Sequence, residues 1–146
     1  MKPKLLFFIL TLATLIGCSK SKITGPYKTA IIGKWAYSAD SVIVIYNGRQ
    51  SYYPGLYNYP GNYYQFNKNG TGTLVLDNQT RNFNYQLSEA QLTINVLAGA
   101  ENGMTAPAYI ETAMINQLDG SSLNLTITYK QSDLEEQVEY ANFIKQ

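Results

Sequence analysis

The sequence predicts an all-β protein, a small antiparallel up-and-down β-barrel of about eight strands. Apolar and polar residues alternate along much of the chain from residue 31 onward, which is the pattern of strands with one buried face. No stretch of a dozen residues shows apolar positions at helical spacing. Short segments that contain Gly, Asn or Asp separate the alternating stretches and supply turns. A barrel is favoured over a sandwich because closure leaves no edge strand.

Nine stretches of the chain are expected to form strands. The alternation is clearest in residues 83–87, 92–96 and 123–129. Weaker candidates, in chain order, are residues 33–38, 42–47, 63–67, 71–77, 109–118 and 137–145. Asn47-Gly48 and Asp119-Gly120 carry the residue types that tight hairpin turns prefer. This succession of short strands and tight turns indicates the up-and-down arrangement.

Residues 1–17 have the pattern of a secretory signal peptide. Lys2 and Lys4 form a positively charged start, and residues 5–16 are predominantly apolar. This apolar run is shorter than the roughly 20 residues that a transmembrane helix needs. A small residue and then Cys18 follow it, so the segment resembles the bacterial lipobox. The resemblance implies that Cys18 is lipidated, for example with palmitate, before the signal peptide is cleaved.

Lipidation of Cys18 would anchor the protein to a membrane without a spanning segment. Cys18 is the single cysteine of the chain, so a lipidated protein has no thiol left for a disulfide. Residues 18–30 are mostly polar and are interpreted as a tether. Ser19 stands where enteric lipoproteins that stay in the inner membrane carry Asp. We therefore expect the bacterial outer membrane, facing the periplasm, with the cell surface as the alternative.

The composition excludes several classes of protein. Lys+Arg number 11 and Asp+Glu 10, and only 14% of the residues are charged. These values argue against a disordered chain and against a nucleic-acid-binding protein, which would show a basic stripe. The chain has no His, which excludes His-dependent catalytic triads and His-ligated zinc. We expect neither a cofactor nor a metal site.

Four motifs, in this order, resemble the lipocalin-like domain of bacterial lipoproteins. They are Gly33-Lys34-Trp35, the segment 64–73 (YQFNKNGTGT), the segment 83–87 (FNYQL) and the segment 92–94 (LTI). The resemblance implies that residues 31–146 form a single lipocalin-like barrel. It also implies that Gly33 and Trp35 have a structural role, with the Trp side chain plugging the closed end.

The segment 46–64 is unusually rich in tyrosine and holds seven of the 13 tyrosines of the chain. Two Pro-Gly pairs interrupt it, so it is expected to be an irregular loop. Tyrosine offers a flat apolar face and a polar tip, which suits ligand recognition. The candidate ligand-binding residues are Tyr52, Tyr53, Tyr57, Tyr59 and Arg49. The alternative is a flap whose tyrosines pack on one another and cover a barrel end.

Acidic residues give no sign of catalysis in the sequence. One group is interpreted as a solvated hairpin tip: Asp133, Glu135, Glu136 and Glu139. The others cannot be paired from sequence: Asp40, Asp77, Glu89, Glu101 and Glu111. Without His, a usable Cys or a carboxylate pair, we expect that the protein is not an enzyme. Residues 98–107, small and irregular, are expected to form a second loop.

Two functions remain open. The first is a binding module for a small hydrophobic or aromatic-compatible ligand, with a cavity of several hundred Å³ behind the Tyr-rich segment. The second is an accessory envelope lipoprotein whose Tyr-rich loop docks a protein or a glycan. A filled interior would favour the second function, with these residues inside: Phe66, Leu74, Leu76, Phe83, Tyr85, Leu87, Ile94, Leu125 and Ile127.

Overall fold

The computed structural model describes residues 27–55, 57, 60–101, 104–132 and 135–146, and all its regular elements are β-strands. The signal-peptide segment, Cys18 and most of the tether lie outside the described residues. The strands are β1 (Gly33–Tyr46), β2 (Arg49–Pro54), β3 (Tyr63–Phe66), β4 (Thr71–Leu76), β5 (Gln79–Ser88), β6 (Gln91–Val96), β7 (Gly99–Glu101), β8 (Met104–Ala106), β9 (Tyr109–Leu118), β10 (Ser122–Ser132) and β11 (Glu135–Lys145). The predicted fold class is confirmed.

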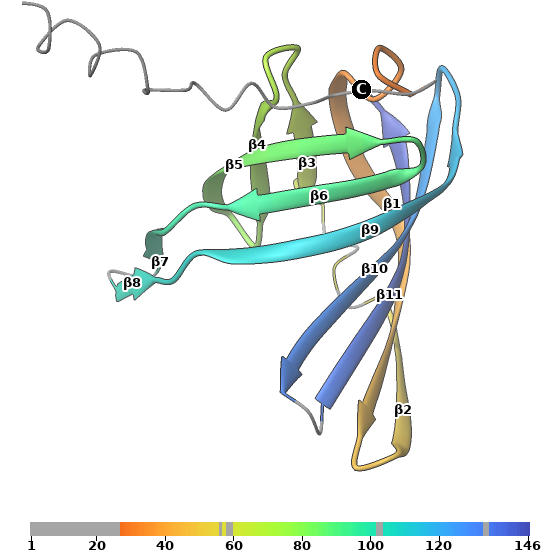
Figure 1. Cartoon of the computed structure of the whole chain (residues 1–146), viewed down its shortest axis with the longest axis vertical. Helices are drawn as coiled ribbons and strands as arrows, with labels where there is room; N and C mark the ends of the chain where they lie inside the picture. The colour runs from red at the N-terminus through yellow and green to blue at the C-terminus, as the bar shows by residue number, and fades with distance from the viewer. Residues whose placement is uncertain (1–26, 56, 58–59, 102–103, 133–134) are drawn as a thin grey trace, which may run out of the picture.

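The barrel closes because the last strand pairs with the first. The order β1-β3-β4-β5-β6-β9-β10-β11 is completed by an antiparallel β11–β1 ladder, which gives a closed barrel of eight strands (Figure 1). β2 is an extra strand beside β1, and β7 and β8 form a separate two-stranded hairpin. Every ladder joins antiparallel neighbours, as an up-and-down barrel requires.

β1 is one long strand where the sequence predicts two. Its first residues, Gly33–Ala36, pair with β3, and its last residues, Ser41–Tyr46, pair with β2. The register against β11 shifts between Tyr37 and Ala39, which marks a β-bulge. The bulge adds a residue and bends the strand without ending it. One strand can therefore serve both the barrel and the projecting sheet.

The projecting sheet, here called the arm, consists of Ser41–Tyr46 of β1, β2, and the ends of β10 and β11 that pair beside them. It extends away from the barrel below β9 in Figure 1. The pairing of β10 with β9 ends at Thr128, so the rest of β10 belongs to the arm alone. The arm thus forms a wall that continues one side of the barrel.

Two predicted loops contain strands. Residues 49–54 of the Tyr-rich segment form β2, because Asn47 and Gly48 take positive φ values of 49° and 74°. Positive φ at both central residues is the geometry of a tight hairpin turn, and it brings the chain back along β1. Residues 98–107 likewise contain the β7–β8 hairpin. The irregular-loop prediction was wrong for these parts of both segments.

The core is aromatic at its centre. The rings of Tyr64, Phe66, Phe83 and Tyr85 lie with centroids 5.0 to 6.2 Å apart. The predicted interior residues are buried, except Leu76, which is partly buried. All buried apolar side chains of the described residues lie between Ile31 and Phe143. Most of these side chains form one continuous core among the described strands.

Trp35 lies in the core at the end of the barrel where β1 begins and β3 and β11 end. Its side chain is fully buried, and its Nε1–H donates a hydrogen bond to the carbonyl oxygen of Ile31 at 2.6 Å. Gly33, two residues earlier, has a φ of 136°, which an L side chain rarely adopts. Along β11, the inward positions run from Phe143 near Trp35 through Ala141 to Glu139. The packing thus changes from aromatic to acidic away from the Trp35 end.

Candidate functional site

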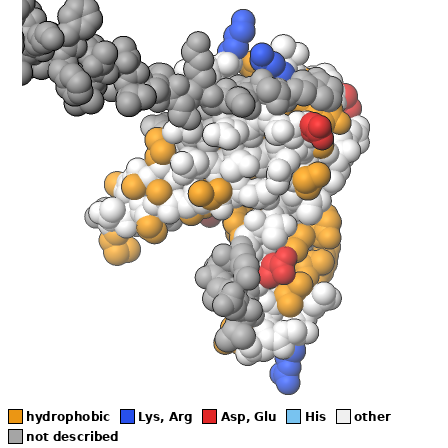
Figure 2. All heavy atoms as spheres, viewed as in Figure 1, with side chains coloured by type: hydrophobic (Ala, Val, Ile, Leu, Met, Phe, Trp, Pro, Cys, Tyr) orange, Lys and Arg blue, Asp and Glu red, His pale blue; other side chains and the backbone are white. Residues whose placement is uncertain are grey.

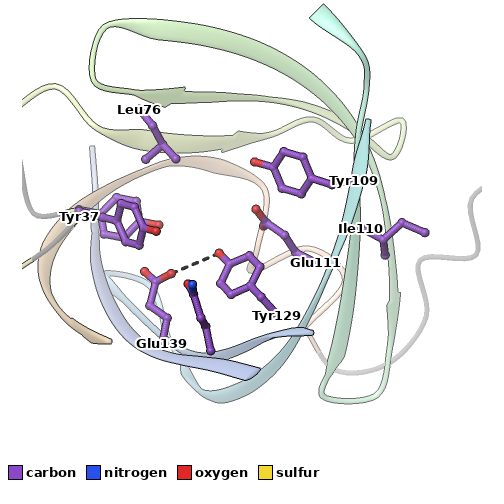
Figure 3. Close-up of a pocket in the computed structure, with 9 residues that line it drawn as sticks. Tyr37, Leu76, Tyr109, Ile110, Glu111, Tyr129 and Glu139 are labelled. Carbon is purple, nitrogen blue, oxygen red and sulfur yellow. Dashed lines mark hydrogen bonds between the residues drawn. The ribbon is translucent and has the colours of Figure 1, made fainter. Parts of the chain in front are cut away.

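A cavity of about 510 Å³ lies inside the barrel (Figure 3). Trp35 is not among the residues that line it. This volume is in the range of small-molecule sites. Its lining residues are Tyr37, Tyr57, Leu76, Tyr109, Ile110, Glu111, Tyr129, Gln137 and Glu139. Five strands and the segment after β2 contribute to it, so the cavity exists only when the barrel is closed.

Strand alternation places two glutamates inside the barrel. On β9, Glu111 has the same parity as the buried residues Ala113 and Ile115. On β11, Glu139 has the same parity as Ala141 and Phe143. Residues two apart on a strand face the same side. Glu111 is 1% exposed and Glu139 is 0% exposed, and Figure 3 shows both carboxyl groups directed into the cavity.

The burial of Glu139 corrects two expectations from the sequence. Glu139 was expected at a solvated hairpin tip together with its acidic neighbours, and this was wrong. Glu111 was expected to have no acidic partner that sequence could identify, yet both glutamates line one cavity. Of the other tip residues, Glu136 is exposed, whereas Asp133 lies outside the described residues.

Glu111 is held by a buried tyrosine. The Tyr64 hydroxyl donates a hydrogen bond to Oε2 of Glu111 at 3.0 Å. Burial raises the pKa of Glu111 to about 7, although the hydroxyls of Tyr64 and Tyr109 and the charge of Arg81 act in the opposite direction. Desolvation penalises the charged form of a carboxyl group. Glu111 therefore exchanges its proton close to neutral pH.

Glu139 has one oxygen with a partner and one without. The Tyr129 hydroxyl donates to Oε2 at 3.2 Å, whereas Oε1 is buried and has no hydrogen-bond partner (Figure 3). Burial and, after it, the charge of the nearby Glu111 raise the pKa of Glu139 to about 8, although the hydroxyls of Tyr129 and Tyr37 act in the opposite direction. A buried polar atom without a partner is costly in a native structure and calls for an explanation.

Tyrosine rings form much of the remaining wall. Tyr37, Tyr57, Tyr109 and Tyr129 all line the cavity, and burial raises the pKa of each hydroxyl. They therefore remain neutral and keep a proton to donate. Together they offer flat apolar faces and polar hydroxyl tips to the cavity.

Tyr57 is fixed in place by its backbone. Its N–H donates to Oδ2 of Asp40 at 3.0 Å, and its carbonyl oxygen accepts a hydrogen bond from Nδ2 of Asn62 at 2.9 Å. The other end of the Asn62 amide accepts from the N–H of Asp77 at 2.8 Å. The buried Asn62 thus ties the segment after β2 to the β4–β5 turn, which positions the Tyr57 ring at the cavity.

The positive charge of Arg81 acts on Glu111, but Arg81 donates its hydrogen bonds to backbone carbonyl groups. Its Nη2 donates to the carbonyl oxygens of Leu97 and Pro107, each at 2.6 Å. Its guanidinium lies 5.2 Å from the centroid of the Tyr109 ring, a cation–π contact. Arg81 therefore secures the β7–β8 hairpin and the Tyr109 ring rather than pairing directly with a glutamate.

The candidate ligand-binding residues predicted from sequence are dispersed. Tyr57 lines the cavity, and Tyr59 lies outside the described residues. Tyr53 and Arg49 are exposed on β2 and do not line the cavity. Tyr53 pairs with Val42, which also pairs with Glu139, so Tyr53 shares a face of the sheet with Glu139. Tyr52 faces the opposite side and is 65% exposed.

Comparisons of the chain with models of known families, with curated proteins and with solved structures found no match. Within the described ranges, no three His, Cys, Asp or Glu side chains are arranged to hold a metal ion. The same part of the chain contains no helix long and apolar enough to cross a bilayer. The site must therefore be judged from its own geometry.

Proposed function

We propose that this protein is a non-catalytic binding module that holds a small ligand in the cavity of its barrel. The observation that carries the proposal is the cavity of about 510 Å³ inside an otherwise filled barrel. A barrel of eight strands has room either for side chains or for one small ligand. Here aromatic side chains fill the half next to Trp35, and the other half is left open.

The lining indicates a ligand with an aromatic or apolar body and a few polar groups. Tyrosine rings and Leu76 supply apolar surface, whereas tyrosine hydroxyls and two carboxyl groups supply polar contacts. A pocket with mainly apolar walls and a small number of convergent polar groups is typical of ligand sites. A lipidated Cys18 would hold this module on a bacterial membrane, in our proposal the outer membrane facing the periplasm.

Native mass spectrometry on residues 19–146, purified from bacterial cells, tests the proposal. We expect an added mass that is lost on denaturation. Tyr57→Ala should lower the bound fraction at least about fivefold, because it removes one wall of the cavity. Tyr52→Ala is the matched control, since Tyr52 is 65% exposed and outside the cavity. A clean protein mass in every preparation, or equal losses in both variants, would contradict the proposal.

A second candidate function is supported by the outer face of the arm. Ile43 pairs with Tyr52 on one side and with Val138 on the other, so the three side chains share this face. Tyr140, two residues along β11, is 45% exposed on the same face. Figure 2 shows hydrophobic side chains gathered along the arm. Such a patch suits docking of an envelope protein or a glycan.

The two candidates predict different effects of one pair of variants. Docking through the arm predicts that Tyr52→Ser abolishes crosslinking to a partner in cells, whereas Tyr57→Ala leaves crosslinking unchanged. Ligand binding in the cavity predicts that Tyr57→Ala alone removes the added mass. Absence of any Tyr52-dependent crosslink would exclude docking through this patch.

A further inference from the structure

The cavity holds an unusual excess of buried carboxyl groups. Glu111 and Glu139 line it, and the buried Asp40 lies close enough to Glu139 to raise its pKa. One oxygen of Glu139 and one of Asp40 are buried without a hydrogen-bond partner. Burying an acceptor without a hydrogen bond destabilises the folded protein. A bound group that donates hydrogen bonds to these oxygens would therefore stabilise it.

We propose that the ligand of this cavity is a protonated aryl-alkyl amine, with its ammonium group bound by the carboxylates of Glu139 and Glu111 and its ring among the tyrosines. The inference rests on the proposed function and specifies its ligand class. An ammonium group has three donors and no acceptor, which matches acceptors that lack a donor. Aromatic rings also attract a cation through their faces.

The charges around the two glutamates favour a cation. The titratable and charged groups that interact with them come from several neighbouring elements: Tyr37 and Asp40 from β1, Tyr57 from the segment after β2, Tyr64 from β3, Arg81 from β5, Tyr109 from β9 and Tyr129 from β10. Asp77, in the β4–β5 turn, acts on Tyr57. Arg81 is the single cation among them, and its Nη2 is bound to two carbonyl oxygens. Arg81 supplies the one positive charge that acts on Glu111, and a cationic ligand would add a second beside three buried carboxyl groups.

Binding of an amine should be coupled to loss of a proton from the protein. In the empty cavity, both glutamates keep their protons to higher pH than exposed carboxyls do, because both are buried. An ammonium group favours the ionised carboxylate, so binding should strengthen as pH rises from 6 towards 8.5. The amine itself stays charged over this range, since alkylamines such as lysine titrate at about 10.4.

Isothermal titration calorimetry on residues 19–146 tests the inference with three probes of similar shape. The probes are phenethylamine, the uncharged phenethyl alcohol and the anionic phenylpropionate. At about pH 8.5 we expect the amine to bind at least about tenfold more tightly than the alcohol, and the carboxylate probe to bind most weakly. At about pH 6 the affinity for the amine should fall at least about tenfold, while that for the alcohol stays constant.

Matched variants locate the effect. Glu139→Gln removes the charge but keeps the shape, and should reduce amine affinity at least about tenfold without weakening alcohol binding. Glu136 lies near Glu139 on β11 and its side chain is exposed. Glu136→Gln should therefore change neither the affinity for the amine nor the affinity for the alcohol. Glu111→Gln provides a second variant within the cavity if E139Q does not fold.

The outcomes separate the two proposals. Equal binding of amine and alcohol, or amine binding that is unaffected by both Glu139→Gln and Glu111→Gln, would overturn the amine assignment and leave the binding module intact. Binding of none of the probes, together with a clean native mass, would overturn both. Tighter binding of phenylpropionate would show that the site selects anions, which also contradicts the inference.

Discussion

Replacing Glu139 with Gln should change how the stability of the barrel depends on pH. The substitution keeps the volume of the side chain and an oxygen that can accept the hydrogen bond from Tyr129. It removes the ability to ionise in a site that is 0% exposed. The wild-type protein is therefore expected to lose stability as the pH rises from 5.5 to 8.5, and the variant to lose much less.

The sign follows from the raised pKa of Glu139, which moves from its ordinary value of 4.5 to about 8 on folding. Between these values the folded chain retains a proton that the unfolded chain has released, so stability falls as pH rises. The contribution is fully present below pH 4.5 and is lost above about pH 8. Each pH unit inside this window corresponds to about 1.4 kcal/mol, so the wild type should lose about 3 kcal/mol more than E139Q between pH 5.5 and 8.5.

Denaturant unfolding at several pH values measures this difference. Glu111, with a pKa of about 7, gives both proteins a smaller decline in the same direction. Hydrogen bonds from the N–H groups of Ser121 and Ser122 lower the pKa of Asp119 to about 2. Asp119 therefore affects stability only at pH values below this range. Glu136→Gln is the control and should follow the wild type. Parallel stability curves for E139Q and the wild type would refute the claim that Glu139 is buried and protonated.

Three further predictions concern the barrel and its anchor. Trp35→Ala should cost about 3–5 kcal/mol in the free energy of unfolding, because it empties a fully buried site; a loss below about 1 kcal/mol would contradict the plug role. Gly72→Ala should lower the melting temperature, because the new methyl group would overlap the ring of Phe83, whereas Gly120→Ala meets no atom within 4 Å; equal effects would be inconsistent with the packing. Cys18→Ser should abolish incorporation of labelled palmitate into the full chain in bacteria, and continued labelling would exclude Cys18 as the lipidation site.

Strand positions were predictable wherever alternation is regular and a turn signal follows. The sequence predicts a strand over residues 109–118, and β9 spans Tyr109–Leu118. Asp119 ends it by accepting hydrogen bonds from the N–H groups of Ser121 and Ser122 at 2.8 and 2.7 Å. Short polar residues that bond their own backbone are the usual cause of such turns.

Irregular pairing was less predictable. The bulge near Ser38 interrupts the alternation of β1, so the pattern divides one strand into two. In the Tyr-rich segment, Pro54 and Gly55 indicate a loop. The hairpin turn at Asn47-Gly48 comes earlier in the chain, and it pairs the residues that follow it with β1 as β2. Pro54 is tolerated because it is the last residue of a strand that pairs on one side only.

The acidic site is not evident from the sequence, because closeness in the chain groups Glu139 with other acidic residues while strand parity places it inside the barrel. Glu139 stands near three other acids in sequence, which suggested a wet tip. Its parity with Ala141 and Phe143 was the available signal that it faces inward. Ala113 of β9 pairs with Ile127 of β10, which pairs with Glu139 of β11, so Glu111, two residues from Ala113, lies on the same face as Glu139. This proximity depends on the register of two successive hairpins, which includes a shift between Asn124 and Leu125 that the sequence does not indicate.

The most direct test of the account is a crystal structure of residues 19–146 grown at alkaline pH with phenethylamine. We expect density for the ring among Tyr37, Tyr57 and Tyr109, with the nitrogen within hydrogen-bond distance of Oε1 of Glu139. Ligand density outside the barrel, or a cavity that stays empty at concentrations that saturate binding in solution, would contradict it.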